Sequence, residues 1–477
     1  MACPLVLPIK RHSMLLMAMM LGLSGCAYLP YVAKPIEPQQ VTQKILEKDP
    51  LSAEFKAFCI TQGYPQDKLP FSSWGIIELT LSAQYHHASL DTAKAQLGTA
   101  KAAIESAGIK TYPTLGGQVA RSNRANGDIR PFAYGLNVEI PIETTNKRAL
   151  RIEEAQHLAE AARLDVAEIA WGLRNQLKHD WLNYHEQQAQ STFLRQISQI
   201  HDKQVELVSK RVSLGLASNT DLALTKTQRA KIQSQLAQVT YKKDALVAAM
   251  AADAGLSKEK FEQIPVAALN MDEAVREAHD YFSNPVRAPE IQSEALLNRI
   301  DIRRSLAKYA AAESKIRLEV ARQTPDISLS PGFIFEFGDK VWSLGFTSLL
   351  NMLQKNSAPI HEAEQLRAVE GAQFEALQAQ IIAEVALTKA QIDASIQQLQ
   401  HANLQKSQQL TTLQKLQQQL DAGLIDRLEL TQAQILYNSY TEELLNAQFW
   451  LLRNATRFEN VMQRTIDVKT PMETISP

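Results

Sequence analysis

The sequence predicts a mainly helical chain with a small β portion, organised as one unit that occurs twice. Two long stretches have the apolar spacing of long helices, and shorter stretches alternate apolar and polar residues. A short motif also recurs, in which a Gly, a Ser or Asp, and an acid stand at intervals of three. Its copies are Gly215, Ser218 and Asp221, and Gly423, Asp426 and Glu429. An internal repeat of this size predicts two similar structural halves.

Each copy of the motif predicts the tip of a helical hairpin. The Gly ends the arriving helix, and the Ser or Asp side chain caps the next helix. The acid falls in the first turn of that helix, where it interacts favourably with the helix dipole. We therefore expect tips at residues 213–221 and 421–429.

Residues 1–25 have the features of a secretory signal peptide. Two basic residues precede the apolar run Met14–Leu21, which is too short to span a membrane as a mature helix. The segment ends in Leu23-Ser24-Gly25-Cys26, which resembles the bacterial lipobox. This resemblance implies that Cys26 carries acyl chains and that Ala27 favours delivery to the outer membrane. The alternative is an ordinary signal peptide with a chance Cys.

The composition argues against several classes of function. Basic and acidic residues nearly balance, at 50 and 51, so nothing favours nucleic-acid binding. Outside the signal peptide and the lipobox, Cys59 is the only cysteine, so no disulfide framework is expected. His86-His87 and His361-Glu362 lack the spacing of metal-binding motifs, and we interpret them as surface histidines. We find no phosphate-binding, nucleophile or dinucleotide motif, and we predict neither catalysis nor a cofactor or metal.

The first repeat is expected at residues 74–264. Before it, residues 26–73 are punctuated by prolines and predict an extended leader. A helix is expected from near Ser73 to near Gly108. Two strands follow, at about 114–122 and 131–142. In the second strand apolar side chains share one face over about ten residues, which is the length and pattern of a membrane-spanning strand.

A very long helix and its return complete this repeat. Residues 146–212 contain no Pro and only Gly172 as a strong breaker. A helix of that length extends about 100 Å, which few compact domains could contain. The return helix is expected at 222–254, followed by a less regular connector at 265–289.

The second repeat, residues 290–464, has the same order. Strands are predicted at about 326–337 and 341–350, with a tight turn at Gly338-Asp339. A second long helix leads to the second tip. Apolar residues of its return helix recur at an average of about 3.5 residues, the seam pattern of a coiled coil. Residues 465–477 form a C-terminal tail.

Four strands in one chain cannot close a barrel. In hydrocarbon, each unpaired backbone group at an open sheet edge costs several kcal/mol. If the strands span a membrane, several chains must therefore pool them. Three copies supply twelve strands, enough for a transmembrane β-barrel with a lumen, and the long helices continue beneath it as a tube. The alternative is that the strand pairs pack on soluble structure.

This order of elements, with the lipobox, resembles the TolC-type outer-membrane efflux channels, in particular their lipid-anchored members. The resemblance covers about residues 74–465. It rests most on the duplicated tips and on the helix-to-Pro entries into the strands at Pro113 and Pro325. It implies a homotrimer with a twelve-stranded barrel in the outer membrane and an α-helical tunnel in the periplasm. It also implies a passive exit duct for drugs or metal ions, with a periplasmic adaptor and an inner-membrane pump as partners.

The resemblance further implies roles for residues at the tips. In the family, acids just after the second tip ring the closed aperture, which makes Glu429 the first candidate and Asp426 the next. A ring of carboxylates attracts cations, and its members repel one another. Arg427 is a candidate partner that would compensate their charge. Gln432 stands where the commoner family pattern has a second acid. The alternative is that Glu429 only complements its helix dipole.

The same resemblance implies that the adaptor contacts both tips. The matching residues here are Gly215, Leu216, Asp221, Gly423 and Leu424. As helix stops, the two glycines need no partner.

Two other functions fit the pattern. The chain could be the exit channel of a protein-secretion system, with the same architecture and a larger cargo. It could also be a periplasmic coiled-coil scaffold or adaptor lipoprotein that conducts nothing. An adaptor is expected to have one hairpin beside a Gly- and Val-rich β module. Here two hairpins and two strand pairs are present, which favours the duct.

Overall fold

The chain divides into two units, residues 1–47 and residues 48–477. The expected signal peptide and Cys26 lie outside the described residues, as does nearly all of the expected tail. The computed structural model describes residues 31–123, 130–283, 298–348 and 355–466.

Helices occupy much of the segment 26–73, so the expectation of an extended leader is wrong there. In the first unit, α2 (Pro38–Leu46) begins with Pro in its first turn. In the second unit, α3 (Ala53–Thr61) buries Phe55 and Cys59, which lie one turn apart. The prolines lie at the start of α2 or outside both helices and do not interrupt them, and apolar residues at helical spacing supply the buried face of α3.

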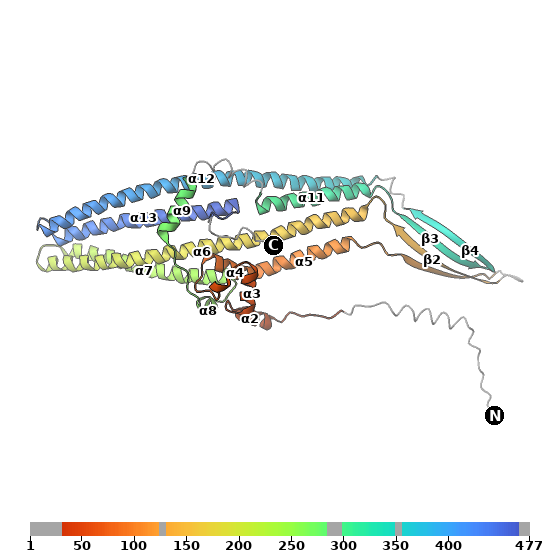
Figure 1. Cartoon of the computed structure of the whole chain (residues 1–477), viewed down its shortest axis with the longest axis horizontal. Helices are drawn as coiled ribbons and strands as arrows, with labels where there is room; N and C mark the ends of the chain where they lie inside the picture. The colour runs from red at the N-terminus through yellow and green to blue at the C-terminus, as the bar shows by residue number, and fades with distance from the viewer. Residues whose placement is uncertain (1–30, 124–129, 284–297, 349–354, 467–477) are drawn as a thin grey trace, which may run out of the picture. The chain divides into compact units, whose positions relative to one another are not determined.

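The second unit contains the order that the sequence predicts (Figure 1). The first half consists of α4 (Ile76–His86), α5 (Ala88–Ala107), β1 (Thr114–Arg121), β2 (Phe132–Ile142), α6 (Lys147–Ser213) and α7 (Asn219–Asp253). The second half consists of α11 (Ile300–Ala321), β3 (Ile327–Glu336), β4 (Asp339–Ser348), α12 (Ser357–Asp421) and α13 (Arg427–Met462). Between them lie α8 (Lys258–Phe261) and α9 (Met271–Phe282). The predicted tandem helix-strand-strand-helix-helix order is confirmed.

The two longest helices begin and end with the same backbone geometry. α6 has 67 residues and α12 has 65. Each follows two residues in the left-handed region, Thr145-Asn146 and Lys355-Asn356. Each is followed by a glycine with positive φ, Gly215 at 75° and Gly423 at 74°. Only glycine adopts this conformation without a steric cost, so it stops each helix where the chain must reverse.

The four strands form one antiparallel sheet in the order β1-β2-β3-β4. Tyr134 of β2 lies opposite Phe335 of β3, and their ring centroids are 4.9 Å apart. Because side chains alternate along a strand, this register gathers large apolar side chains on one face and mostly small or polar side chains on the other, where Ile334 and Val341 are exceptions. β1 and β4 each have one paired neighbour among the described strands, so both are edges.

The turn between β3 and β4 lies one residue earlier than expected. It consists of Phe337 and Gly338, with φ of 48° and 121°. Asp339, expected within the turn, instead pairs with Glu336 as the first residue of β4. Two central residues with positive φ are typical of the two-residue turns that match strand twist.

The first predicted helix is interrupted at His87, which ends α4 and caps α5. Its backbone is extended, with φ −80° and ψ 125°, and its ring Nδ1 accepts a hydrogen bond from the N–H of Ser89 at 3.2 Å. His86 is buried with its ring centroid 5.0 Å from that of Phe55, and its backbone lies close to Gly255. Burial lowers the pKa of His86 to about 4. The prediction of a surface histidine is therefore wrong for this residue.

The connector between the repeats is also more regular than expected. α9 begins after Asn270, whose side chain accepts a hydrogen bond from the N–H of Glu273 at 3.4 Å. Its last residue, Phe282, packs edge-on against Phe458 of α13, with ring centroids 5.1 Å apart. Residues 284–297 lie outside the described residues.

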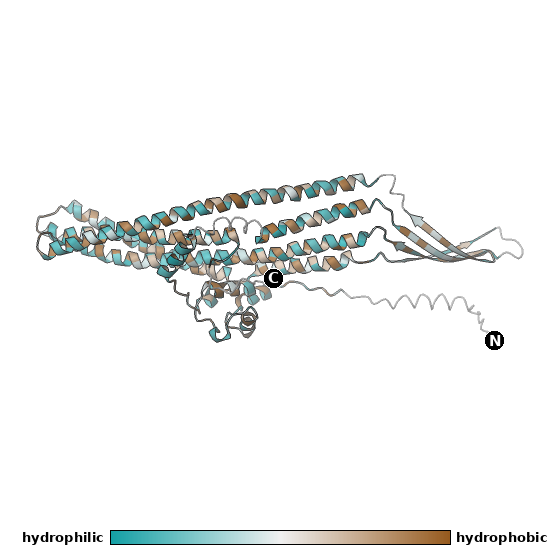
Figure 2. Cartoon of the chain, turned by 45° about the horizontal axis from the view of Figure 1, so that its top comes forward, coloured by the Kyte–Doolittle hydropathy of each residue, from teal (hydrophilic) through white to brown (hydrophobic). Residues whose placement is uncertain are grey.

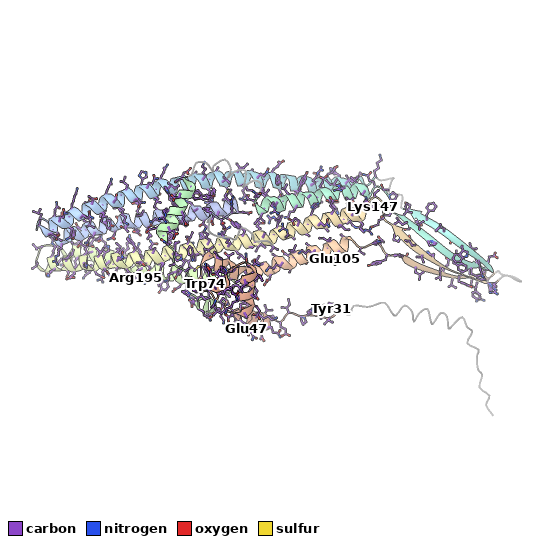
Figure 3. The ribbon with its side chains drawn as sticks, in the orientation of Figure 1. Tyr31, Glu47, Trp74, Glu105, Lys147 and Arg195 are labelled. Carbon is purple, nitrogen blue, oxygen red and sulfur yellow. The ribbon has the colours of Figure 1, made fainter. Side chains whose placement is uncertain are left out.

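The long helices form a layer whose two faces differ. α6 contacts α5, α7, α11 and α13, and α12 contacts α11 and α13. The short helices α3, α4 and α8 pack around Trp74 against one face of α6 (Figure 3). Figure 2 shows apolar and polar positions interleaved along the long helices. Within the described residues, no helix has both the length and the apolar character needed to cross a membrane.

Two buried charges connect the halves of the chain. Lys147, at the start of α6 beside the strands (Figure 3), donates to Asp326 in the second half at 2.7 Å. Glu459 of α13, which is 1 % exposed, lies 2.6 Å from Lys178 and 3.6 Å from Arg174, both on α6. Removing the cations that pair with Glu459 costs about 3–5 kcal/mol, because its charge would stay buried without compensation. These contacts fix α6 against the second repeat.

Candidate functional site

The two helical tips lie side by side at the end of the second unit that is farthest from the sheet (Figure 1). In both tips, backbone N–H groups that follow the arriving helix donate hydrogen bonds to carbonyls of its last turn. Leu216 N–H donates to Arg211 O at 2.8 Å, and Leu424 N–H donates to Gln419 O at 2.9 Å. The leucine side chains are left 68 % and 74 % exposed. The backbone of each tip is thus satisfied internally, while its apolar side chain faces solvent.

Asp221 at the first tip is committed to its own helix. Its carboxylate accepts from the N–H of Ser218 at 3.0 Å, and its N–H donates to the Ser218 hydroxyl at 3.1 Å. These reciprocal bonds form a capping box, and they hold the pKa of Asp221 below its ordinary value. The arrangement gives Asp221 a structural role.

Asp426 at the second tip has two roles. Its Oδ1 accepts from the N–H groups of Leu428 and Glu429, at 2.7 and 3.0 Å, and so caps α13. Its Oδ2 lies 2.9 Å from the guanidinium of Arg211 at the end of α6. The hydrogen bond from Glu429 N–H is the largest of the effects that lower the pKa of Asp426, and the charge of Arg211 adds to it. The tips are therefore joined by an ion pair.

Arg211 is the tip residue that the sequence analysis missed. We expected Arg427 as the compensating cation, and the structure places Arg427 exposed in the first turn of α13 without an ion pair in the described part of the chain. A basic residue in the last turn of a helix is a usual complement to the dipole, so Arg211 alone gave no indication of a partner across the tips.

Glu429 is exposed in the first turn of α13. Within the described residues, its carboxylate has no hydrogen bond or ion pair. Gln432, one turn further, is exposed as well. The carboxylate of Glu429 is therefore free to meet solvent, an ion or another copy of the chain.

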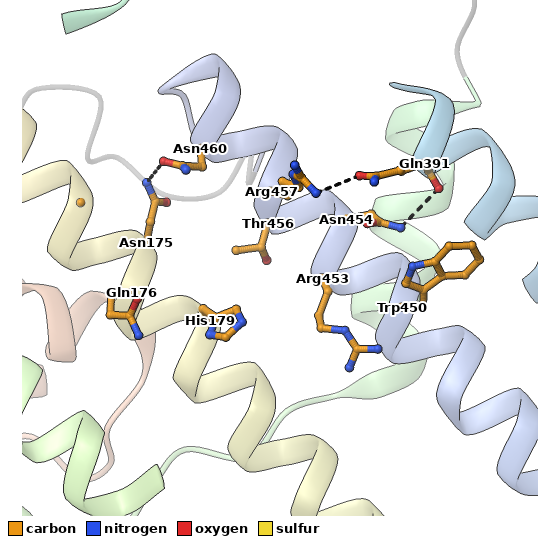
Figure 4. Close-up of a pocket in the computed structure, with 11 residues that line it drawn as sticks. Asn175, Gln176, His179, Gln391, Trp450, Arg453, Asn454, Thr456, Arg457 and Asn460 are labelled. Carbon is orange, nitrogen blue, oxygen red and sulfur yellow. Dashed lines mark hydrogen bonds between the residues drawn. The ribbon is translucent and has the colours of Figure 1, made fainter. Parts of the chain in front are cut away.

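A polar recess lies between α6, α12 and α13 (Figure 4). Its volume is about 560 Å³. Asn175 donates to Asn460 across it at 2.7 Å, and Arg457 donates to Gln391 at 3.2 Å. On α6 the recess is lined by Gly172, Gln176 and His179, whereas Leu173 and Trp181 of the same helix pack on the cluster of short helices. The recess therefore opens on the face that does not carry the short helices.

The sheet presents an exposed apolar face. Large side chains on this face are between 40 and 83 % exposed along three strands. They are Val119 on β1, Tyr134, Leu136 and Ile140 on β2, and Trp342, Leu344 and Phe346 on β4. An apolar surface of this extent in one chain indicates a membrane or another protein as its neighbour. Within the described residues there is no cluster of three or more His, Cys, Asp or Glu that could hold a metal ion.

Comparisons with known proteins agree with this arrangement. The sequence model of the outer membrane efflux protein family matches residues 80–255. The cobalt-zinc-cadmium resistance protein CzcC of Cupriavidus metallidurans is 25 % identical over 341 residues, which is 71 % of this chain and 75 % of that protein.

Solved structures have the same fold. The outer membrane protein VceC of Vibrio cholerae superimposes with a TM-score of 0.63 at 17 % identity, over 82 % of this chain and 97 % of that one. The outer-membrane channel OprN superimposes with a TM-score of 0.66 at 16 % identity, over 92 % of this chain and 100 % of that one. CusC superimposes with a TM-score of 0.63 at 16 % identity, over 92 % of this chain and 99 % of that one.

The molecule thus has the fold of the outer-membrane channel proteins. Over residues 80–255 the chain matches the outer membrane efflux protein family. The resemblance predicted from the sequence is confirmed, and the comparisons support an outer-membrane efflux channel in general terms.

The ion pair between the tips predicts that Arg211→Gln and Asp426→Asn loosen them equally. Asn keeps the cap of α13, so only the ion pair is lost. An exposed ion pair contributes at most about 1 kcal/mol. In either variant the population of molecules with separated tips should therefore rise by up to about fivefold. Spin labels at Leu216→Cys and Leu424→Cys measure the separation. If the double variant shows the sum of the two effects, the residues do not act as a pair.

The same pair predicts a dependence on pH. Because the pKa of Asp426 is lowered in the folded chain, its stabilising contribution is present above its ordinary value of 3.8 and is lost as pH falls through the lowered pKa. The spin-label distances of the wild type should approach those of Asp426→Asn only below about pH 4.

Proposed function

We propose that three copies of the chain form a passive exit duct across the outer membrane and into the periplasm. The observation that carries the proposal is a four-stranded sheet with an exposed apolar face and two edge strands, β1 and β4, continued by helices too long for a compact domain. In hydrocarbon such edges must pair, and joining β4 of one chain to β1 of the next satisfies both. Twelve pooled strands enclose a lumen.

The two faces of the helical layer indicate which face lies inside the proposed tube and which lies outside. The short helices and α9 occupy one face, and a tube with these elements inside would be blocked. We place them on the outside, so that the polar recess lined by Gln176, His179 and Arg457 faces the lumen. A solute would then pass along polar and charged side chains, while the apolar side chains stay packed between neighbouring helices.

The tips are the proposed docking end of the duct. The exposed Leu216 and Leu424, beside Gly215 and Gly423, offer an apolar surface to a periplasmic adaptor linked to an inner-membrane pump. Asp221 lies at the same end, where its helix-capping bonds would shape that surface. The pump would supply the energy, since we predict no catalytic site in this chain.

We also propose that Cys26 carries the lipid anchor. The residue follows Leu23-Ser24-Gly25, the pattern of a lipobox, and lies outside the described residues. Acyl chains on Cys26 would hold the start of the mature chain at the membrane that the sheet spans.

The duct is tested by purifying the full chain and inserting it into planar lipid bilayers. We expect trimers that conduct ions, because only pooled strands close the sheet. Glu429→Ala should alter closed-state leak or reduce cation selectivity, since three free carboxylates around a narrow axis attract cations and repel one another. The matched control is Gln432→Ala, one turn away and uncharged.

The outcomes separate the two claims. A monomer without conductance contradicts the duct. Conducting trimers in which Glu429→Ala and Gln432→Ala behave alike contradict only the role of Glu429.

Among the solutes, we propose divalent metal ions. The support is the 25 % identity to a protein named for resistance to cobalt, zinc and cadmium. Deleting the gene from its host should lower tolerance to these metals, and the wild-type gene should restore it. Unchanged metal tolerance together with reduced tolerance to organic drugs would assign the duct to another class of solute.

A further inference from the structure

Three cations lie at the end of the sheet that is farthest from the helices. Arg121 is the last residue of β1, Arg130 precedes β2, and Lys340 is the second residue of β4. All three are exposed. The register places Arg121 opposite Phe132 and Lys340 opposite Phe335, so these two cations belong to the apolar face.

Two of these cations lie over aromatic rings at the border of that face. The guanidinium carbon of Arg121 is 5.7 Å from the ring centroid of Phe132, and that of Arg130 is 6.0 Å from the ring centroid of Phe335. Side chains of this kind keep their aliphatic stems on apolar surface and direct the charge to water. None of the three cations has an ion pair within the described residues.

The acids that the structure describes at this end lie on the other face. Glu336 and Asp339 pair in the register between β3 and β4, and the alternation places them opposite to the face of Phe335. Among the described residues, the apolar face therefore has a border of positive charge without a paired acid.

The height of the apolar band places this border at a membrane surface. β2 has 11 residues, so it extends about 37 Å at about 3.4 Å per residue. Tilted by about 45°, it rises about 25 Å, which is the height of the lipid-facing band of outer-membrane barrels. The cations then stand at the level of the lipid headgroups on the side away from the tips.

We propose that Arg121, Arg130 and Lys340 bind the phosphate groups of lipid headgroups in the outer leaflet. The inference rests on the proposed barrel. Arg121 and Lys340 are on the two edge strands, so closing β4 of one chain onto β1 of the next brings them together across each chain boundary. Three copies form one basic ring, and bound lipid phosphates bridge neighbouring chains.

The test compares lipid binding by purified trimers. Wild type and the triple variant Arg121→Gln, Arg130→Gln and Lys340→Gln are incubated in detergent with lipid A, which carries two phosphates, or with phosphatidylcholine, and retained lipid is counted by native mass spectrometry. The control removes three exposed lysines from the helices, Lys101→Gln, Lys231→Gln and Lys242→Gln. Each cation near an anionic lipid surface changes affinity about fivefold, so we expect roughly 100-fold weaker lipid A binding by the triple variant alone.

Three results would overturn the proposal. In the first, the triple variant binds lipid A as tightly as the wild type, and in the second, the lysine control loses as much binding as the triple variant. In the third, inorganic phosphate at a concentration similar to that of lipid A releases lipid A from the wild type. The last would mean a site for free phosphate. Conductance in bilayers separates this inference from the duct, because the triple variant should still form conducting trimers. If the wild type forms none, the duct itself fails.

Discussion

The rest of the structure depends on one constraint, the two unpaired edges of the four-stranded sheet. β1 and β4 each carry a row of backbone groups without partners in the described residues, on a sheet whose one face is apolar and exposed. In hydrocarbon these groups must pair, and the described part of one chain offers no further strand to them. In the proposed trimer the long helices attached to the same strands would assemble with the same symmetry, so the sheet would determine how many helices surround the tube.

Within one chain, charge holds the helical layer in shape. Glu459 ties α13 to α6 through Lys178 and Arg174, and Arg211 ties the first tip to Asp426 of the second. The two contacts differ in strength. The first is buried and costly to break, while the second is exposed and worth at most about 1 kcal/mol. In the proposed tube, the strong contact of Glu459 would keep the helical wall fixed, and the weak contact between the tips would let the opening move.

The fold could be predicted from the sequence wherever a pattern persists. Period-two alternation in residues 131–142 predicted β2, and glycine followed by a capping residue predicted both tips, because these patterns act locally. Predictions failed where tertiary contacts decide. The break at His87 depends on packing near Gly255, and the burial of Phe55 and Cys59 depends on helices far along the chain. The pairing of Arg211 with Asp426 links residues 215 positions apart, which no local spacing encodes.

The central claim, that β4 of one chain pairs with β1 of the next, is tested most directly by disulfide cross-linking in membranes. Val119→Cys on β1 is combined in turn with Lys340→Cys, Trp342→Cys and Leu344→Cys on β4. Tyr134→Cys with Phe335→Cys, which face each other within one sheet, is the intrachain control. The account predicts that at least one edge combination links chains into species no larger than trimers. Edge cysteines that stay unlinked, while the control pair closes within single chains, would contradict it.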